Sequence, residues 1–284
     1  MDQLTKLKLA VAGSRYGHGE ARLARRAREL GSSAFSEVLD GLSRADLDRV
    51  SAEAEALCER GISATLLGSN EYPPSLGEIR NAPPTLFYVG SSELLSAPGI
   101  GMCGSRNATE EGLNAAAACG EVAARQGLAV VSGYARGVDM ATHVSALAAG
   151  GTTVIVLPEG ITRFRVKRGA FADAWDPARA LVISQFAPSR PWSAATAMTR
   201  NVVIIGLSLA LIVIEASEKG GTLAAGTTAL DLNRRVFTLE FAQTPPGNSL
   251  LLRRGAVPVS NRSVLSDRLA QLASNPGGNQ LLII

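Results

Sequence analysis

Short apolar segments alternate with helical patterns over most of the chain. Such segments stand at 100–103, 128–132, 152–157, 181–184, 209–215 and 236–239, and most of them end at a turn that contains glycine. Helical patterns at 110–126 and from the turn near residue 137 to Ala149 separate the first three segments. This alternation predicts right-handed βαβ crossovers and an α/β fold with a doubly wound, mostly parallel sheet.

From Glu20 to about Arg60 the chain follows a helical pattern instead. Leu23, Ala27 and Leu30 share a face before a break at Gly31, and apolar residues recur at similar spacing between Ala45 and Arg60. A segment rich in proline and glycine, 68–91, then leads into a predicted strand that ends at Gly90. We therefore expect a small helical N-terminal region over 1–61 and a second domain over 62–284.

The longest apolar run, Val202 to Ile214, is about half of the ~20 residues that a membrane span needs. It predicts a buried strand and turn. One more helix is predicted at 263–273. Because the N-terminus also lacks a segment long enough for a signal peptide, we expect a cytoplasmic protein that does not enter a membrane.

Composition narrows the chemistry further. Hydrophobic residues make up 46% of the chain but aromatic residues only 5%, which favours helices packed on a parallel sheet. The three cysteines and two histidines are not at metal-ligand spacing, so neither a metal site nor a disulfide framework is expected. The net charge of +3 is weakly basic, and arginine clusters at 22–28 and 163–168 are most simply solvated helix faces or loop rims.

Glycine turns with a nearby cation follow several of the predicted strands. "GSR" follows the strand at 100–103, "SGYARGVDMATH" covers 132–143, and "KGGT" follows the strand at 209–215. The carboxyl ends of parallel strands share one edge of a sheet, and that edge is where open α/β sheets bind ligands. Glycine permits close approach of the backbone, exposed helix N-termini offer free N–H groups, and arginine binds phosphate oxygens in pairs. The pattern predicts an anion site, although Asp139 alone is most simply a helix cap.

In these segments the chain resembles the DprA/Smf family of bacterial DNA-processing proteins of natural transformation. The resemblance runs from Ile62 to Asn261 and is carried by the order and spacing of six blocks. The blocks are "GSR", "VVSGYARGVDMATHVSAL", "GGTTVIVLPEGI", "RNVVIIGLS", "VIEASEKGGTLAAG" and "PGNSLLLRRGAVPV".

The resemblance implies an extended Rossmann-like domain that binds single-stranded DNA in a positively charged pocket. It also implies a homodimer that helps to load the RecA recombinase, with no catalytic residues and no cofactor. Arg106 and Arg136 are implied to hold backbone phosphates, and Arg200 with Asn201 to contact the strand. The full set of implied DNA-binding residues is Gly104, Ser105, Arg106, Gly133, Arg136, Gly137, Asp139, Arg200, Asn201, Lys219, Gly220, Gly221 and Thr222.

The chain departs from the family pattern at several positions. Val202 stands where the family usually has arginine, and Gln185 where it usually has glutamate. The loop after "PGN" is shorter, and we expect no C-terminal winged-helix domain. These departures affect the expectation of recombinase loading more than the expectation of the fold.

Two other functions stay open. A nucleotide-binding or nucleotide-cleaving enzyme is one, with Glu159 and Glu215 as candidate carboxylates at strand ends. However, the glycine turn at 220–221 is not followed by the glutamate expected of the nucleotide-cleaving relatives of this fold. A scaffold that has lost binding is the other.

The roles of a few aromatic and imidazole side chains also stay open. Tyr134, Phe164 and Trp192 are candidates for base stacking, although packing is the simpler interpretation for each. His143 is either at the rim of the site or a packing or dimer residue.

Overall fold

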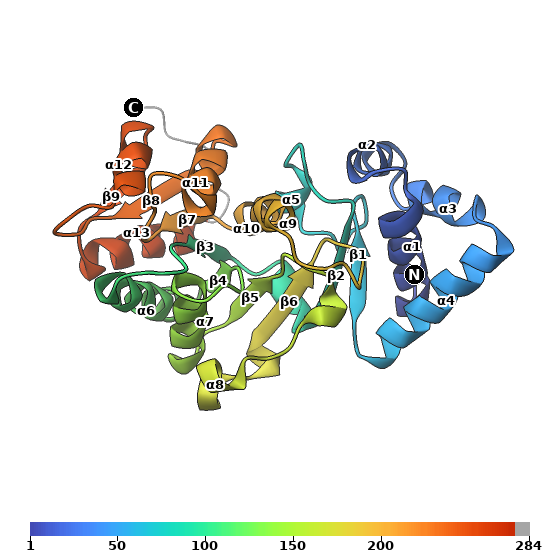
Figure 1. The fold of residues 1–284 in the computed structure, drawn as a ribbon, viewed down its shortest axis with the longest axis horizontal. Coiled ribbons are helices and arrows are strands. Elements are labelled where there is room, and N and C mark those ends of the chain that lie inside the picture. The colour runs from blue at the N-terminus through green and yellow to red at the C-terminus, as the bar shows by residue number, and fades with distance from the viewer. Residues whose placement is uncertain (276–284) are drawn as a thin grey trace.

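A single nine-stranded sheet runs through the computed structural model, which describes residues 1–275 (Figure 1). The strand order is β1-β2-β6-β5-β4-β3-β7-β8-β9. The strands are β1 (Ser63–Leu66), β2 (Thr85–Gly90), β3 (Gly99–Cys103), β4 (Ala129–Ser132), β5 (Thr153–Val156), β6 (Ala180–Ser184), β7 (Ala210–Val213), β8 (Arg235–Leu239) and β9 (Val257–Val259).

The sheet is parallel from β6 to β9 and antiparallel at the other end. β1 pairs with β2 and β2 with β6 in antiparallel register, whereas the remaining pairs are parallel. This confirms the doubly wound, mostly parallel α/β fold. β9 extends the parallel part beyond the last strand that the sequence predicts, because its three residues are too few to show a period.

Alternate residues of the central strands fill two separate cores. Ile100 and Met102 of β3 pack on one face, together with Ile212 of β7. Leu211 and Val213 of β7 pack on the opposite face. Because side chains of a strand alternate between faces, apolar residues at every position are what a sheet covered on both sides requires.

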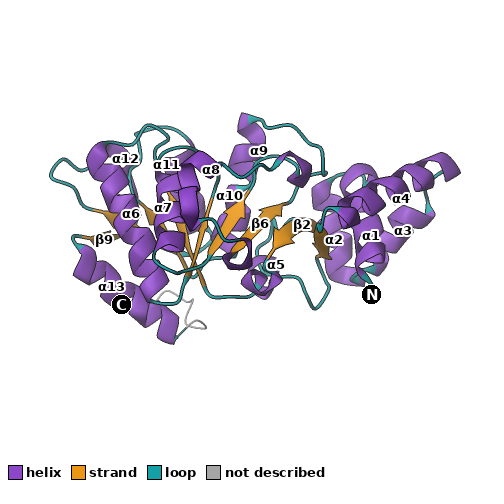
Figure 2. Ribbon diagram, turned by 90° about the horizontal axis from the view of Figure 1, so that it is seen from below, coloured by secondary structure: helices purple, strands orange, loops and turns teal. Residues whose placement is uncertain are grey.

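Helices cover both faces, as Figure 2 shows with the strands running between them. The helices of the sheet region are α5 (Pro74–Gly77), α6 (Glu110–Arg125), α7 (Val138–Ala148), α8 (Arg168–Phe171), α9 (Ala194–Thr199), α10 (Asn201–Gly206), α11 (Gly221–Asp231), α12 (Pro246–Arg253) and α13 (Arg262–Ser274). Short 3₁₀ turns lie at Ser92–Leu95, Ile161–Arg163, Ala172–Ala174 and Pro177–Arg179. The helix that the sequence predicts at 263–273 is α13.

Four helices precede β1 and lie at one end of the molecule (Figure 1). They are α1 (Gln3–Tyr16), α2 (Glu20–Leu30), α3 (Ser33–Asp40) and α4 (Arg44–Glu59). Leu7 and Val11 of α1 are fully buried and belong to the same apolar core as Leu66 of β1. The helices therefore pack on the sheet, and the division into 1–61 and 62–284 stays a prediction.

Three details differ from the sequence-based expectation. The run 202–214 is not strand and turn throughout, because its first part forms α10 before β7 begins. Leu30, placed on the same apolar helix face as Leu23 and Ala27, is 42% exposed whereas those two are buried. Helix α1 was not predicted at all. Within residues 1–275, no helix combines the length and the apolar character that crossing a bilayer demands.

Candidate functional site

A cleft opens where the order of the strands reverses. β3 is flanked by β4 on one side and by β7 on the other, so the loops that leave β3 and β7 diverge. Open α/β sheets bind ligands at such a point. The cleft here measures about 400 Å³, and we call it the central cleft. Its lining residues are Cys103, Gly104, Ser105, Arg106, Asn107, Ala135, Asp139, Trp192, Ala194, Ala197, Met198, Arg200, Asn201, Ile204, Ser217, Gly221, Thr222 and Ala225.

Gly137 holds the loop after β4 against the loop after β3. Its φ of +82° lies in the left-handed region, and a side chain there would overlap the carbonyl oxygen of Ser105. Val138 donates its N–H to that same carbonyl at 3.2 Å. Next to this contact, the guanidinium of Arg136 donates to the side-chain oxygen of Asn107. The two loops therefore present Arg136 and Asn107 side by side at the surface.

Gly133 makes room for two buried charges. A Cβ at this position would overlap Nη1 of Arg200 and Oδ2 of Asp139. Arg200 is only 6% exposed and donates to the carbonyl of Val156 at 3.0 Å, while its Nε has no hydrogen-bond partner in the described part of the chain. Asp139 is 7% exposed, and its Oδ2 accepts the N–H of Ala135 at 3.4 Å. The floor of the central cleft thus carries a buried guanidinium near a buried carboxylate.

Burial and charge act in opposite directions on this pair. Burial raises the pKa of Asp139, and the nearby guanidinium of Arg200 opposes the rise. Burial also lowers the pKa of Arg200, and the carboxylate of Asp139 opposes the fall. Since an isolated charge is costly in the interior, each group stabilises the other. Their charges offset, so the net positive charge of the central cleft comes from Arg106.

His143 supports the turn at Gly133 from inside the protein. It is fully buried, and its Nε2 and Nδ1 lie 2.6 Å from the carbonyl of Gly133 and the hydroxyl of Thr153. Burial lowers the pKa of His143 to about 4, although the hydrogen bond to Gly133 opposes the shift. The ring is therefore neutral near pH 7, with Nε2 donating to the carbonyl. His143 packs inside the fold and does not line the central cleft, so packing is the one of the open roles that the structure shows.

Trp192 and Arg106 form the exposed mouth of the central cleft. The guanidinium carbon of Arg106 lies 5.8 Å from the centre of the Trp192 ring, which is close enough for a cation–π contact. Trp192 is 50% exposed. An exposed indole beside an arginine that forms no ion pair within residues 1–275 offers a flat stacking surface next to a positive charge.

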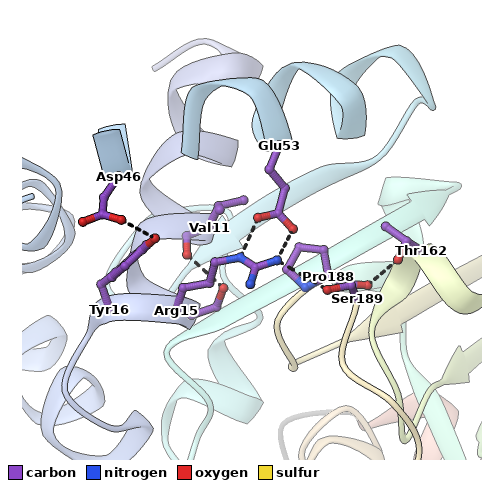
Figure 3. Close-up of polar contacts among 9 residues, drawn as sticks. Val11, Arg15, Tyr16, Asp46, Glu53, Thr162, Pro188 and Ser189 are labelled. Atoms are coloured by element: carbon purple, nitrogen blue, oxygen red, sulfur yellow. Dashed lines mark hydrogen bonds and ion pairs between the residues drawn. The ribbon is translucent and has the colours of Figure 1, made fainter. Parts of the chain in front are cut away.

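The loop that leads to Trp192 is fastened to the N-terminal helices. Arg15 of α1 donates twice to Glu53 of α4, at 2.6 Å each, and once to the Ser189 hydroxyl at 3.4 Å (Figure 3). In the same view the hydroxyl of Thr162 donates to the carbonyl of Pro188 at 2.6 Å. These contacts fix the course of the chain just before the mouth of the cleft.

Tyr134 and Phe164 belong to a packed aromatic cluster rather than to the cleft. Their ring centres are 5.3 Å apart, and Phe171 and Trp175 pack against them. The ammonium of Lys167 lies 4.2 Å from the centre of the Tyr134 ring. The packing interpretation thus holds for Tyr134 and Phe164, and Trp192 is the stacking candidate that lines the cleft.

Comparison with known proteins identifies the family. The sequence pattern of DNA recombination-mediator protein A matches residues 63–270. The chain belongs to this family. The match confirms the resemblance carried by the six sequence blocks.

Individual members of the recombination-mediator family show how far the likeness extends. The DNA processing protein DprA of Streptococcus pneumoniae is 33% identical over 59% of this chain and 59% of its own length. The chain spans little more than half the length of the curated relatives it first matches. The crystal structure of DNA processing protein A from S. pneumoniae matches with a TM-score of 0.71 and 25% identity, over 93% of this chain and 97% of that one.

A second solved structure shares the fold. It is the DNA processing protein A of Helicobacter pylori, described for its single-stranded DNA binding mode. It matches with a TM-score of 0.64 and 22% identity, over 74% of this chain and 96% of that one.

The structure brings together only part of the residues implied by the family resemblance. Those that line the central cleft are Gly104, Ser105, Arg106, Asp139, Arg200, Asn201, Gly221 and Thr222. Gly133 and Gly137 shape the cleft from behind without lining it. Arg136 lies beside it through Asn107, and Lys219 and Gly220 are exposed in the loop before α11.

Several residues that line the central cleft were missed in the sequence, and the polar ones and the methionine among them are Asn107, Met198 and Ser217. Asn107 directly follows "GSR" and was within reach of the same argument. Met198 and Ser217 carried no signal, because the turns that bring them to the cleft depend on how α9 and the loop after β7 pack.

The carboxylates proposed for an enzyme lie elsewhere. Oε2 of Glu215 accepts the N–H and the hydroxyl of Thr109 at 3.0 and 2.8 Å, where it fixes the start of α6. Neither Glu159 nor Glu215 lines the central cleft. Among the residues described, no three His, Cys, Asp or Glu side chains are grouped so as to hold a metal ion.

Proposed function

We propose that this protein binds single-stranded DNA across the central cleft and acts as a DNA recombination mediator. The observation that carries the proposal is the pair Arg106 and Arg136, on loops after adjacent strands. Both are exposed, and neither forms an ion pair with a carboxylate among the described residues. Cations placed in this way neutralise phosphates at little cost in desolvation.

The other residues of the site take complementary roles in this proposal. Trp192 stacks on a base beside the phosphate held by Arg106. The backbone N–H groups at Gly221 and Thr222, in the uncapped first turn of α11, receive a second phosphate. Arg200 and Asn201 line the floor, while Gly104, Ser105, Gly133 and Gly137 give the backbone its shape.

We extend the proposal to the cellular role that the relatives suggest. Membership of the recombination-mediator family supports a role in recombination, and the single-stranded DNA binding mode described for the H. pylori protein supports the same ligand here. Loading of a RecA-type recombinase, a homodimer and a cytoplasmic location are part of the proposal.

Binding is tested by fluorescence anisotropy with a labelled oligothymidylate. Raising the salt from about 50 to about 200 mM should weaken binding at least tenfold, because each phosphate contact releases counterions. Replacing both cations, in Arg106→Ala/Arg136→Ala, should weaken binding by about tenfold or more and flatten the salt dependence.

The matched control is Arg44→Ala/Arg49→Ala, which removes two exposed arginines of α4. This control should bind like the unmodified protein. Salt-independent binding, or equal loss in both double variants, contradicts the proposal.

A further inference from the structure

A second and larger cleft lies on the far side of the segment 198–202. It measures about 810 Å³ and opens between α2, the loop that precedes β2 and the start of α10. Thr199 and Val202 line it, whereas Met198, Arg200 and Asn201 line the central cleft. We call it the lateral cleft. One short helical segment therefore separates the two hollows.

Three arginines line the lateral cleft. Arg25 and Arg80 are exposed and have no hydrogen bond or ion pair to any residue within 1–275. Arg28 donates to the carbonyl of Ile79 at 2.6 Å, which fixes its position but leaves its charge unneutralised. Unpaired guanidinium groups at the edge of a hollow attract an anion and bind phosphate oxygens in pairs.

Two acidic residues, Glu20 and Glu29, also line the lateral cleft. Burial raises the pKa of Glu20, and the charge of Arg190 and a hydrogen bond from Gln185 oppose the rise. With three arginines against two carboxylates, the side chains that line the lateral cleft carry a net positive charge.

Gln185 gives the lateral cleft an unsatisfied acceptor. It is 5% exposed, it lines the cleft, and its Oε1 has no hydrogen-bond partner among the residues that the structure describes. Buried acceptors without a partner are rare because losing the hydrogen bond to water is costly. A donor N–H from a molecule that enters the lateral cleft would satisfy it.

We propose that the lateral cleft binds a nucleotide unit, with its phosphate at Arg25 and Arg80 and the N–H edge of its base at Gln185. A phosphate alone would leave Gln185 unsatisfied, whereas a nucleotide supplies both the anion and the donor. The cleft adjoins the central cleft across residues 198–202, so a strand held at Arg106 reaches it by crossing that segment. In this form the inference rests on the proposed function.

The nucleotide unit in the lateral cleft can come from two sources, a free nucleotide or the next unit of a bound strand. Labelled oligothymidylates of about 4 to about 20 nucleotides distinguish them, because a short strand fills only the central cleft. The variant Arg25→Ala/Arg80→Ala should bind the shortest strand like the unmodified protein and the longest about tenfold more weakly. Gln185→Met should show the same length dependence. The control Arg22→Ala/Arg44→Ala removes two exposed arginines outside the cleft and should change nothing.

The second experiment is a calorimetric titration with dAMP. Binding that is lost in Arg25→Ala/Arg80→Ala and Gln185→Met supports a free nucleotide as the occupant. If these variants bind DNA strands of every length and dAMP like the unmodified protein, the proposal of a nucleotide site in the lateral cleft is wrong. If the variants lose only the binding of an oligoglutamate peptide, the nucleotide site is also overturned, in favour of an acidic protein partner.

The two proposals fail separately. Loss of binding in Arg106→Ala/Arg136→Ala, together with unchanged binding in the lateral variants, rejects the lateral cleft alone. Unchanged binding in both sets rejects the proposed function.

Discussion

The two clefts on either side of residues 198–202 differ in which polar groups they bury. In the central cleft, Arg200 is buried beside the carboxylate of Asp139 and fastened to a backbone carbonyl. In the lateral cleft the arginines are exposed, and the buried polar group is the neutral Gln185. The charged floor of the central cleft is therefore part of the core, whereas the arginines of the lateral cleft lie on the surface.

This difference determines what a substitution does. A buried guanidinium requires a carboxylate nearby and a backbone that leaves room, so changes at the floor of the central cleft act on folding as well as on binding. Exposed and unpaired arginines contribute little to folding. Stability and binding should therefore change together at the buried floor of the central cleft and separately at the exposed arginines of the lateral cleft.

Gly133→Ala should have the largest effect on the buried Arg200 and Asp139 at the floor of the central cleft. The new methyl group would overlap Arg200 and Asp139 and force the two buried charges apart. We expect a loss of roughly 3–5 kcal/mol in the free energy of unfolding, the range for disrupting buried charge pairs. Urea denaturation measures it.

The control for this substitution is Gly169→Ala. Nothing lies within 4 Å of a Cβ at 169, and its φ is not positive. Its free energy of unfolding should stay close to that of the unmodified protein. Equal stability of the two variants would show that Gly133 is not the support of the buried pair.

Lowering the pH should weaken the same region through His143. Its pKa is about 4 in the folded protein and 6.5 in the unfolded chain, so the unfolded chain takes up the proton first. The contribution is complete above about pH 6.5 and is lost as the pH falls to about 4, and it amounts to roughly 3 kcal/mol. Urea denaturation across this range, in the unmodified protein and in His143→Gln, measures it.

The difference between the unmodified protein and His143→Gln isolates the contribution of His143 to stability. Asp139, whose pKa is raised by burial, contributes with the opposite sign, but it is present in both. The His143→Gln variant should show a shallower loss of stability in acid. Parallel curves would mean that the pKa of His143 is the same in the folded protein and in the unfolded chain.

Most of the fold could be predicted because its signals are local. Runs of apolar residues with glycine turns identified β3 to β8, and their common direction placed the turns at one edge. Helix α1 was not predicted because its apolar residues do not form one stripe: Leu7, Leu9, Ala10, Val11 and Ala12 are all buried. A helix buried on several sides shows no period.

The sites were less accessible to sequence reasoning than the fold. The glycines and Arg106 were found because a turn motif is contiguous in the chain. The burial of Arg200 was not visible, because it follows from the approach of Gly133 and Asp139, more than sixty residues earlier. The lateral cleft joins α2 to Gln185 and Val202, and no linear pattern connects residues that far apart.

Trp192 offers the smallest and most specific test of the comparison, because its half-exposed ring lines the central cleft without belonging to the buried core. We expect Trp192→Ala to weaken binding of single-stranded DNA by about 1–3 kcal/mol, the range for one stacked base. The salt dependence should stay the same, since no charge is lost. Trp192→Phe should retain most of the affinity because a flat ring remains, whereas Leu113→Ala, another exposed apolar residue, should change nothing. Anisotropy titrations at two salt concentrations measure all three, and a Trp192→Ala variant that binds normally would remove stacking from the central cleft and leave only its phosphate contacts.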